Sequence, residues 1–247
     1  KEMLSHGNIW FVTCSQWLSR QAKRSGLLRG ISVRDIPNPI DSHFFQPQDK
    51  QAARKRLHLP DDRRLVLFVS QRVTDQRKGM DYFVEAVARM AEEHPEMKGH
   101  TGIAILGGHA EELEGKLALP VYPIGYVSDQ QRIRDVYNAA DVFVLPSLED
   151  NLPNTIMEAM ACGVPCVGFA VGGIPEMIDH RKNGYVAAER DAADLAKGIR
   201  WVLDEADYKA LSEAAVAKVL HSYSQRSVAR QYLEVYNEAM AYKNFCL

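Results

Sequence analysis

This sequence lacks the features that mark several broad classes of protein. No apolar run is long enough to cross a bilayer, and the first residues do not form a secretory signal. Its 30 basic and 32 acidic residues nearly cancel, so the net charge gives no indication of nucleic-acid binding. What remains is the composition of an ordinary globular protein, whose 247 residues suffice for one large domain or two small ones.

Cysteine is scarce, and the cysteines do not have the spacing of a metal site. They are Cys14, Cys162, Cys166 and Cys246. No second cluster of cysteine or histidine accompanies them, so we expect no metal ligands among them. Cys162 and Cys166 stand beside small apolar residues, which predicts buried free thiols in a reducing compartment.

The charge is unevenly placed along the chain. From Lys1 to Arg56 there are ten basic and four acidic residues, and the remainder is net acidic. A solvated helix face accounts for this excess, and the alternative is contact with an anionic membrane surface. Because the sequence begins at Lys1 rather than at methionine, we expect it to be a piece of a longer protein.

Runs rich in β-branched residues alternate with helical patterns through the middle of the chain. Strands are predicted over Leu65–Ser70, Gly102–Leu106, Val121–Ile124, Asp141–Leu145 and Pro165–Gly168. Helices are predicted between them over Met80–Glu93, Asp129–Asn138, Thr155–Ala161 and Pro175–Ile178. This order predicts a parallel sheet with helices on both faces, in which ligands bind at the carboxyl ends of the strands.

Both ends of the chain depart from this alternation. The opening residues predict a strand, a helix and a second strand over Ile9–Thr13, Gln16–Ser25 and Ile31–Ile36. The following prolines and the polar run Gln46–Gln51 predict a boundary near residue 47. Asn183-Gly184 predicts a hairpin-like turn. Helical patterns end the chain over Ala192–Leu203, Asp207–His221 and Ser224–Tyr242.

The most informative stretch places two acids around the start of a helix. Asp150 lies in a loop before a Pro-Asn-Thr start, and Glu158 lies about one turn inside the helix. The free N–H groups at this start belong to Asn154, Thr155 and Ile156. Because a helix N-terminus attracts anions, this arrangement suits a phosphorylated sugar. The alternative is that Asp150 only caps the helix and that Glu158 is a solvated surface residue.

Three further motifs follow predicted strands. Arg72 and Lys78 offer two cations for a diphosphate, or belong to a solvated basic loop. Gly107 and Gly108 allow a ligand to approach the backbone closely, although paired glycines are also common in turns. The main chain near Val127 is placed to bond a nucleobase, or is a plain connection into the next helix.

Taken together, these motifs resemble the donor half of retaining GT-B glycosyltransferases of family 4. The resemblance rests on R-x5-K-G, G-Y-V, P-S-x-x-D-N-x-P-N-x-x-x-E-A-x-A-C-G-x-P and G-G-x-P-E, which occur in the order of that family. It covers roughly residues 30 to 205. The opening residues, with Ser15-Gln16-Trp17 and Pro37-Asn38-Pro39, are similar to the tail of the family's acceptor domain.

The resemblance implies two facing Rossmann-like domains, of which this chain holds mostly the C-terminal one. Residues 1–46 are then the tail of the N-terminal acceptor domain and a linker. Residues 47–223 form the donor-binding domain, and residues 224–247 form a helix that packs back toward the N-terminal domain.

The resemblance also implies roles for single residues. Arg72 and Lys78 neutralise the donor diphosphate, whose oxygens the N–H groups of residues 154–156 bind. Glu158 accepts hydrogen bonds from the ribose, and residues 107, 108 and 127 line the donor site. Asp150 stands where the family has a glutamate that contacts the transferred sugar, and Glu149 is the alternative for that role.

The implied reaction is transfer of a hexose from a nucleotide-diphosphate sugar to an acceptor hydroxyl, with retention of configuration. The implied setting is polysaccharide or glycan synthesis in the cytoplasm, at the inner face of the membrane, with a sugar or lipid-linked glycan as acceptor. We expect no cofactor and no metal, since the sequence contains no Asp-x-Asp. The alternatives are a nucleotide-sugar epimerase and a non-catalytic nucleotide-sugar binding module. No G-x-G-x-x-G follows the first buried strand, which argues against a dehydrogenase.

Overall fold

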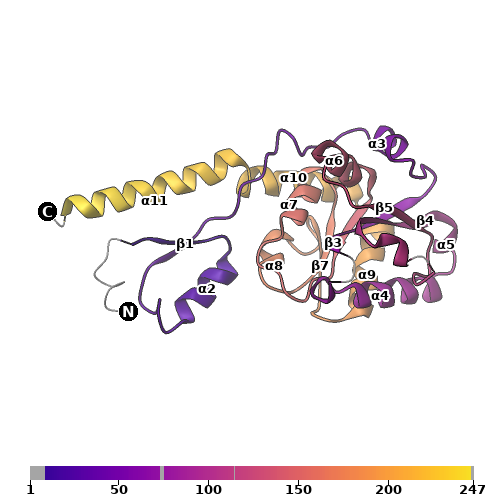
Figure 1. Ribbon diagram of the computed structural model, residues 1–247, viewed down its shortest axis with the longest axis horizontal. Coiled ribbons are helices and arrows are strands. Elements are labelled where there is room, and N and C mark those ends of the chain that lie inside the picture. The colour runs from indigo at the N-terminus through magenta and orange to yellow at the C-terminus, as the bar shows by residue number, and fades with distance from the viewer. Residues whose placement is uncertain (1–8, 73–74, 114, 246–247) are drawn as a thin grey trace.

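A computed structural model describes residues 9–72, 75–113 and 115–245 of the chain. It has the predicted α/β architecture, a parallel sheet of six strands with helices on both faces (Figure 1). Every strand and helix predicted for the middle of the chain is present, with ends that differ by at most two residues. Cys246 and residues 73–74 of the R-x5-K-G motif lie outside the described residues.

The six strands are arranged in the order β5-β4-β3-β6-β7-β8, and every neighbouring pair is parallel. Their bounds are Arg64–Arg72 (β3), Thr101–Gly108 (β4), Val121–Gly125 (β5), Val142–Leu145 (β6), Cys166–Phe169 (β7) and Gly184–Ala187 (β8). The chain therefore builds outward from β3 to β5, returns to β6 on the other side of β3, and then builds outward again. This reversal makes the carboxyl ends of β3 and β6 the switch point of the sheet.

Alternate strand residues face two separate cores. Phe68 lies in the core under α4 (Met80–Glu93) and α9 (Ala192–Arg200), whereas its neighbour Leu67 lies in the other. The second core is covered by α3 (Lys50–Leu57), α6 (Gln130–Ala139), α7 (Asn154–Ala161) and α10 (Tyr208–Ser222). Short helical segments connect these elements at α5 (Met97–His100), α8 (Ile174–Met177), η1 (Gln76–Lys78), η2 (Ala110–Leu113) and η3 (Trp201–Glu205).

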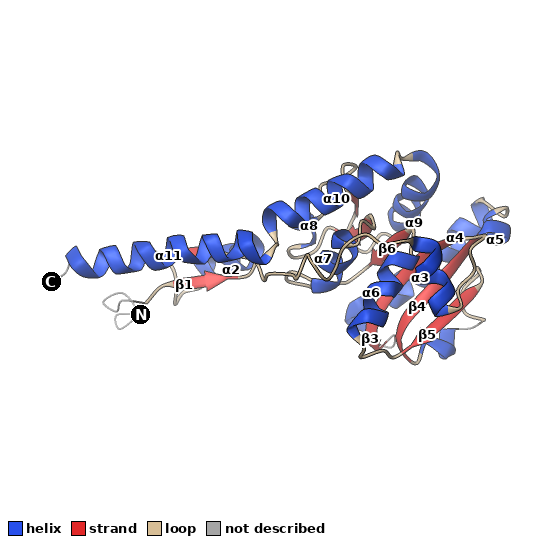
Figure 2. Cartoon of the chain, turned by 90° about the horizontal axis from the view of Figure 1, so that it is seen from above, coloured by secondary structure: helices blue, strands red, loops and turns tan. Residues whose placement is uncertain are grey.

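The opening unit consists of β1 (Phe11–Thr13), α2 (Gln16–Arg24) and β2 (Val33–Asp35), and its two strands form a parallel sheet of their own. Figures 1 and 2 show that this unit lies beside α11 (Gln225–Phe245), the long helix at the other end of the chain. A small core that includes Ile36 and Val235 joins the two. The two ends of the sequence thus form one assembly next to the main sheet.

Two local features differ from the prediction: the turn at residues 181–183 does not lead into a hairpin, and one helix was not predicted. Asn183-Gly184 does not form a hairpin, because the chain from Gly184 onward pairs in parallel with β7. A side chain at Gly184 would meet the carbonyl oxygen of Cys166 at 2.1 Å, so the glycine permits this close approach of strands. The second miss is α3, which begins at Lys50 inside the run predicted as a boundary. Its apolar stripe is short, and burial of Ala53 and Arg54 supplies contacts that the sequence pattern did not show.

The burial predicted for two of the cysteines is confirmed. Cys162 and Cys166 are buried free thiols, and burial raises the pKa of Cys162 to about 12. Cys14 is also free but only half-buried. Among the described residues, no helix combines the length and the apolar character needed to cross a bilayer.

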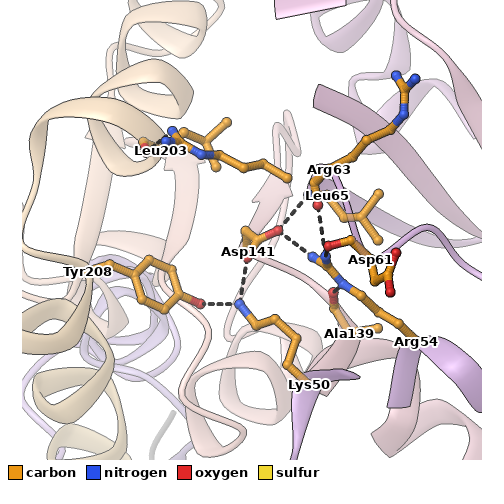
Figure 3. Close-up of polar contacts among 10 residues, drawn as sticks. Lys50, Arg54, Asp61, Arg63, Leu65, Ala139, Asp141, Leu203 and Tyr208 are labelled. Atoms are coloured by element: carbon orange, nitrogen blue, oxygen red, sulfur yellow. Dashed lines mark hydrogen bonds and ion pairs between the residues drawn. The ribbon is translucent and has the colours of Figure 1, made fainter. Parts of the chain in front are cut away.

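A largely buried carboxylate ties three elements together at the amino end of the sheet (Figure 3). Asp141 stands just before β6 and accepts hydrogen bonds from Lys50 Nζ, Arg54 Nη2 and the main-chain N–H of Leu65, each at 2.6 Å. Arg54, of which 6% of the side chain is exposed, also donates to the carbonyl oxygens of Ala139 and Arg63. This network fixes α3 against β3 and β6 at the edge opposite the switch point.

We predict that Asp141→Ala lowers the free energy of unfolding by ~3–5 kcal/mol, because it leaves the Arg54 guanidinium buried without its anion. Urea unfolding followed by circular dichroism measures the change. Glu213→Ala is the matched control, since Glu213 is 71% exposed and lies 3.9 Å from its partner Lys209. We expect the control to leave the unfolding midpoint unchanged. Equal stability of wild type and Asp141→Ala would show that the network does not hold α3.

Candidate functional site

The loops that leave β3 and β6 meet at the switch point. Gly79 ends the first loop in a left-handed conformation (φ +68°), and a side chain there would meet the carbonyl oxygen of Pro146 at 1.9 Å. The main-chain N–H of Leu148 donates to the carbonyl oxygen of Arg77 at 2.8 Å. We call the loop between β3 and α4, which carries Lys78, the basic loop, and residues 146–153, which carry Asp150, the acidic loop. Gly79 and this hydrogen bond bring the two loops into direct contact.

A charged pair joins the same two loops. Lys78 Nζ donates to Asp150 Oδ2 at 2.7 Å, and both side chains are largely buried. Glu149, the alternative acid, is exposed to solvent. The structure thus directs Asp150 rather than Glu149 toward the basic loop, and neither is the side-chain cap of α7.

Arg72 is the last residue of β3, at the start of the basic loop. It lies opposite Gly108 in the register of β3 and β4, so the two neighbouring glycines, Gly107 and Gly108, share its edge of the sheet. Its side chain is exposed and forms no ion pair with any residue that the structure describes. Val127 lies farther along this edge, between β5 and α6, where its side chain packs on the second core.

The start of α7 offers two free donors rather than the three predicted. Pro153 is the N-cap of this helix and not its first helical residue. The N–H of Ile156 donates to the carbonyl oxygen of Pro153 at 3.1 Å. Those of Asn154 and Thr155 donate to no described residue. An anion at this helix end would therefore meet two unpaired N–H groups and the positive end of the helix dipole.

Glu158 is not a solvated surface residue. Burial raises the pKa of its carboxyl, and the hydrogen bond from Tyr137 Oη at 2.7 Å works in the opposite direction. Tyr137, a residue of α6, is itself completely buried. One carboxylate oxygen is thus bonded inside the protein, and Glu158 carries a charge that its surroundings compensate only in part.

Three residues of the site make contacts that the sequence did not indicate. The turn Gly172-Gly173 presses against the acidic loop, since side chains there would meet the carbonyl oxygens of Asp150 and Asn151 at 1.6 and 2.1 Å. The adjacent glycines were visible in the sequence, but what they contact was not. Asn151 extends away from the loop toward the opening unit, and no pattern in the sequence indicated that partner.

No group of three or more histidine, cysteine, aspartate or glutamate side chains placed to hold a metal occurs within residues 9–72, 75–113 and 115–245. The switch point therefore combines exposed or paired cations, two free N–H groups and two partly buried carboxylates. Such a set can bind a ligand that carries both phosphate charge and hydroxyl groups.

Comparison with known proteins gives a consistent result. A family model described as "Glycosyl transferases group 1" matches residues 63–205. The D-inositol 3-phosphate glycosyltransferase of Thermobispora bispora is 29% identical over 217 residues, which cover 83% of this chain and 50% of that protein. The chain thus spans about half the length of the curated relatives it matches.

Two solved structures share the fold. The sucrose-phosphate synthase of Thermosynechococcus elongatus aligns with a TM-score of 0.79 and 25% identity, over 94% of this chain and 58% of that one. The Anabaena protein HepE, solved in complex with UDP-glucose, aligns with a TM-score of 0.74 and 20% identity, over 92% and 63%. The fold is that of a GT-B glycosyltransferase, and the matched sequence, which includes both loops of the switch point, makes this chain a member of the group 1 glycosyl transferase family.

Proposed function

We propose that this chain is the donor-binding part of a retaining, family 4 glycosyltransferase that transfers a hexose from a nucleotide-diphosphate sugar to an acceptor hydroxyl. The observation that carries the proposal is the meeting of Lys78, Asp150 and the free N–H groups of α7 at one switch point. The UDP-glucose in HepE supports a donor of this class. We assign residues 1–46, 47–223 and 224–247 to the acceptor-domain tail, the donor domain and the returning helix.

The leaving group of such a reaction is a nucleoside diphosphate, whose negative charge grows in the transition state. We assign Arg72, Lys78 and the N–H groups of Asn154 and Thr155 to that charge. A preorganised donor of this kind is worth ~3 kcal/mol of transition-state stabilisation. In the unliganded site Lys78 is paired with Asp150, so the diphosphate shares or replaces that carboxylate as its partner.

Glu158 is assigned to the ribose. Its second carboxylate oxygen has no donor among the described residues, and two adjacent hydroxyls supply the hydrogen bonds that an ionised carboxylate requires. Asp150 is assigned to the transferred sugar because it lies beside Lys78, whereas Glu149 faces solvent. The glycines at the end of β4 let the donor approach the main chain, and the main chain near Val127 meets the base.

The remaining parts of the proposal concern the whole protein. The diphosphate charge is neutralised by side chains and helix N–H groups, so we propose catalysis without a metal or cofactor. The acceptor is a sugar or lipid-linked glycan, and the reaction takes place in the cytoplasm. Three exposed basic residues of the opening unit and the turn that follows α2, Lys23, Arg24 and Arg29, are the proposed contact with an anionic membrane.

We predict that Glu158→Gln weakens binding of the cognate nucleoside diphosphate by ~1–3 kcal/mol, because an amide oxygen is a poorer acceptor for ribose hydroxyls than a carboxylate. Calorimetry with uridine, guanosine and adenosine diphosphates measures this loss. Glu149→Gln is the matched control and should bind as wild type does. Unchanged affinity of Glu158→Gln for a diphosphate that the wild type binds would remove Glu158 from the site.

The same variant makes a prediction about stability. The pKa of Glu158 is raised in the folded protein, so its contribution to stability is present at low pH and is lost as pH rises through the folded pKa. Glu158→Gln should therefore unfold at the same or a higher temperature than wild type at pH 7. Its advantage should shrink as the pH falls toward 4, which thermal unfolding across that range measures.

We predict that Arg72→Ala and Lys78→Ala each lower affinity for the nucleoside diphosphate at least about tenfold while changing affinity for the free nucleoside little, because both cations act on phosphate. Arg77→Ala is the matched control from the same loop, since Arg77 is paired with Asp75 and exposed. Calorimetry with the two ligands gives the comparison. Equal losses for nucleoside and diphosphate would contradict contact with the phosphates.

Incubation of the chain with donor alone separates transfer from epimerisation. We expect no epimer, slow hydrolysis at most, and poor transfer to acceptors, because most of the acceptor domain is outside this sequence. Chromatography of the nucleotide-sugar pool measures all three. A changed nucleotide-sugar without any acceptor would indicate an epimerase, and full transfer activity would contradict the proposed domain division.

A further inference from the structure

Asn151 links the acidic loop of the donor site to the opening unit. Its Oδ1 accepts a hydrogen bond from Ser15 Oγ at 2.5 Å, and its Nδ2 donates to Cys14 Sγ at 2.9 Å. Ser15 is buried, with 3% of its surface exposed, although it lies 136 positions away in the sequence.

A second link runs parallel to the first. The carboxylate of Glu176, in α8, accepts hydrogen bonds from the main-chain N–H groups of Gln16 and Trp17 at 2.8 and 2.5 Å. Ser15 Oγ accepts from Leu18 N at 3.0 Å. The first free N–H groups of α2 are therefore satisfied by its own cap and by a residue of the main domain.

The two links share one rigid support. The turn Gly172-Gly173 leads into α8 and presses on the carbonyl oxygens of Asp150 and Asn151, so Glu176 cannot move with α2 without disturbing the acidic loop. Asp150, next to Asn151, holds Lys78. A continuous set of contacts thus runs from the start of α2 to the charged pair of the donor site.

The surface where α2 meets the main domain, which we call the seam, is joined mainly by polar contacts. A cavity of about 430 Å³ lies there, lined mostly by polar residues that include Ser15, Gln16 and Glu176. Few apolar side chains fill the space between α2 and the main domain at this point. The side chain of Asn151 suits the position, because an amide both accepts from a hydroxyl and donates to a thiol, whereas aspartate only accepts.

We propose that Asn151 is a positioning residue that couples the opening unit to Asp150. When α2 is seated, Ser15 and Cys14 hold the Asn151 amide, and this fixes the Asp150 carboxylate for the transferred sugar. When α2 moves away, the amide is released and Asp150 is free to shift with it. This inference rests on the proposed role of Asp150 in donor binding, while the coupling itself is independent of that role.

Hydrogen exchange tests the coupling without any ligand. Asn151→Ala should raise exchange at the amides of Gln16 and Trp17, and Ser15→Ala should raise exchange in the 146–152 loop across the seam. Ser25→Ala is the matched control, because Ser25 Oγ bonds only locally, to the carbonyl oxygen of Ala22 and the main-chain N–H of Leu28. Reciprocal effects are required if the two sites are coupled. Exchange changes confined to the mutated element in both variants would overturn the proposal.

Ser15 also caps α2, so Ser15→Ala loses stability from the cap as well as from the bond to Asn151. The two contributions must be measured separately. Thermal unfolding of Ser15→Ala, Asn151→Ala and the double variant forms a double-mutant cycle that does so. We expect the double variant to unfold at about the temperature of the weaker single variant. Strict additivity of the two shifts would show that no link exists.

The effect on the donor site is measured with UDP and UDP-glucose as probes. Asn151→Ala should leave the dissociation constant of UDP within about twofold, and it should weaken UDP-glucose about tenfold relative to UDP, because only the sugar meets Asp150. Equal weakening of both probes would refute positioning of Asp150. If wild type binds neither probe, the proposed uridine donor fails, and hydrogen exchange still decides the coupling.

Discussion

The arrangement of this protein depends on the contact between the loop after β3 and the loop after β6. A single glycine at position 79 lets the two backbones approach, and the hydrogen bond from Leu148 to Arg77 holds them. Because the strand order reverses between β3 and β6, the chain leaves β3 toward α4 on one face of the sheet and leaves β6 toward α7 on the other. Lys78 and Asp150 can therefore pair there, beside the open end of α7.

Two partly buried acids show how the fold separates stability from the proposed function. Asp141, at the amino end of the sheet, is surrounded by two cations and a main-chain N–H. Glu158, near the carboxyl end, has one neutral partner and a raised pKa. The first acid has all the partners that a buried charge needs, and it stabilises the scaffold. The second is incompletely satisfied, which is the condition expected of a carboxylate that awaits ligand hydroxyls.

The opening unit is bonded to the loop that forms part of the proposed donor site. Its helix α2 begins against Glu176, and its serine cap reaches Asn151, so the glycine turn, the acidic loop and α2 contact one another. Relatives of this family are about twice as long as the matched region, and the opening unit precedes the main sheet in the chain. In the proposed coupling, a movement of the opening unit would reach the proposed donor site through these few polar contacts.

The sequence by itself determined the strand and helix order, the parallel sheet and the two acids spaced around a helix start, because these follow from local periodicity and turn chemistry. It also indicated the cations after β3. Only the tertiary structure decided that Lys78 pairs with Asp150, that Glu149 faces solvent, that Ile156 is not a free donor and that Asn151 reaches Ser15. These are contacts between segments far apart in the chain, or details of how one helix starts, and periodicity carries no information about them.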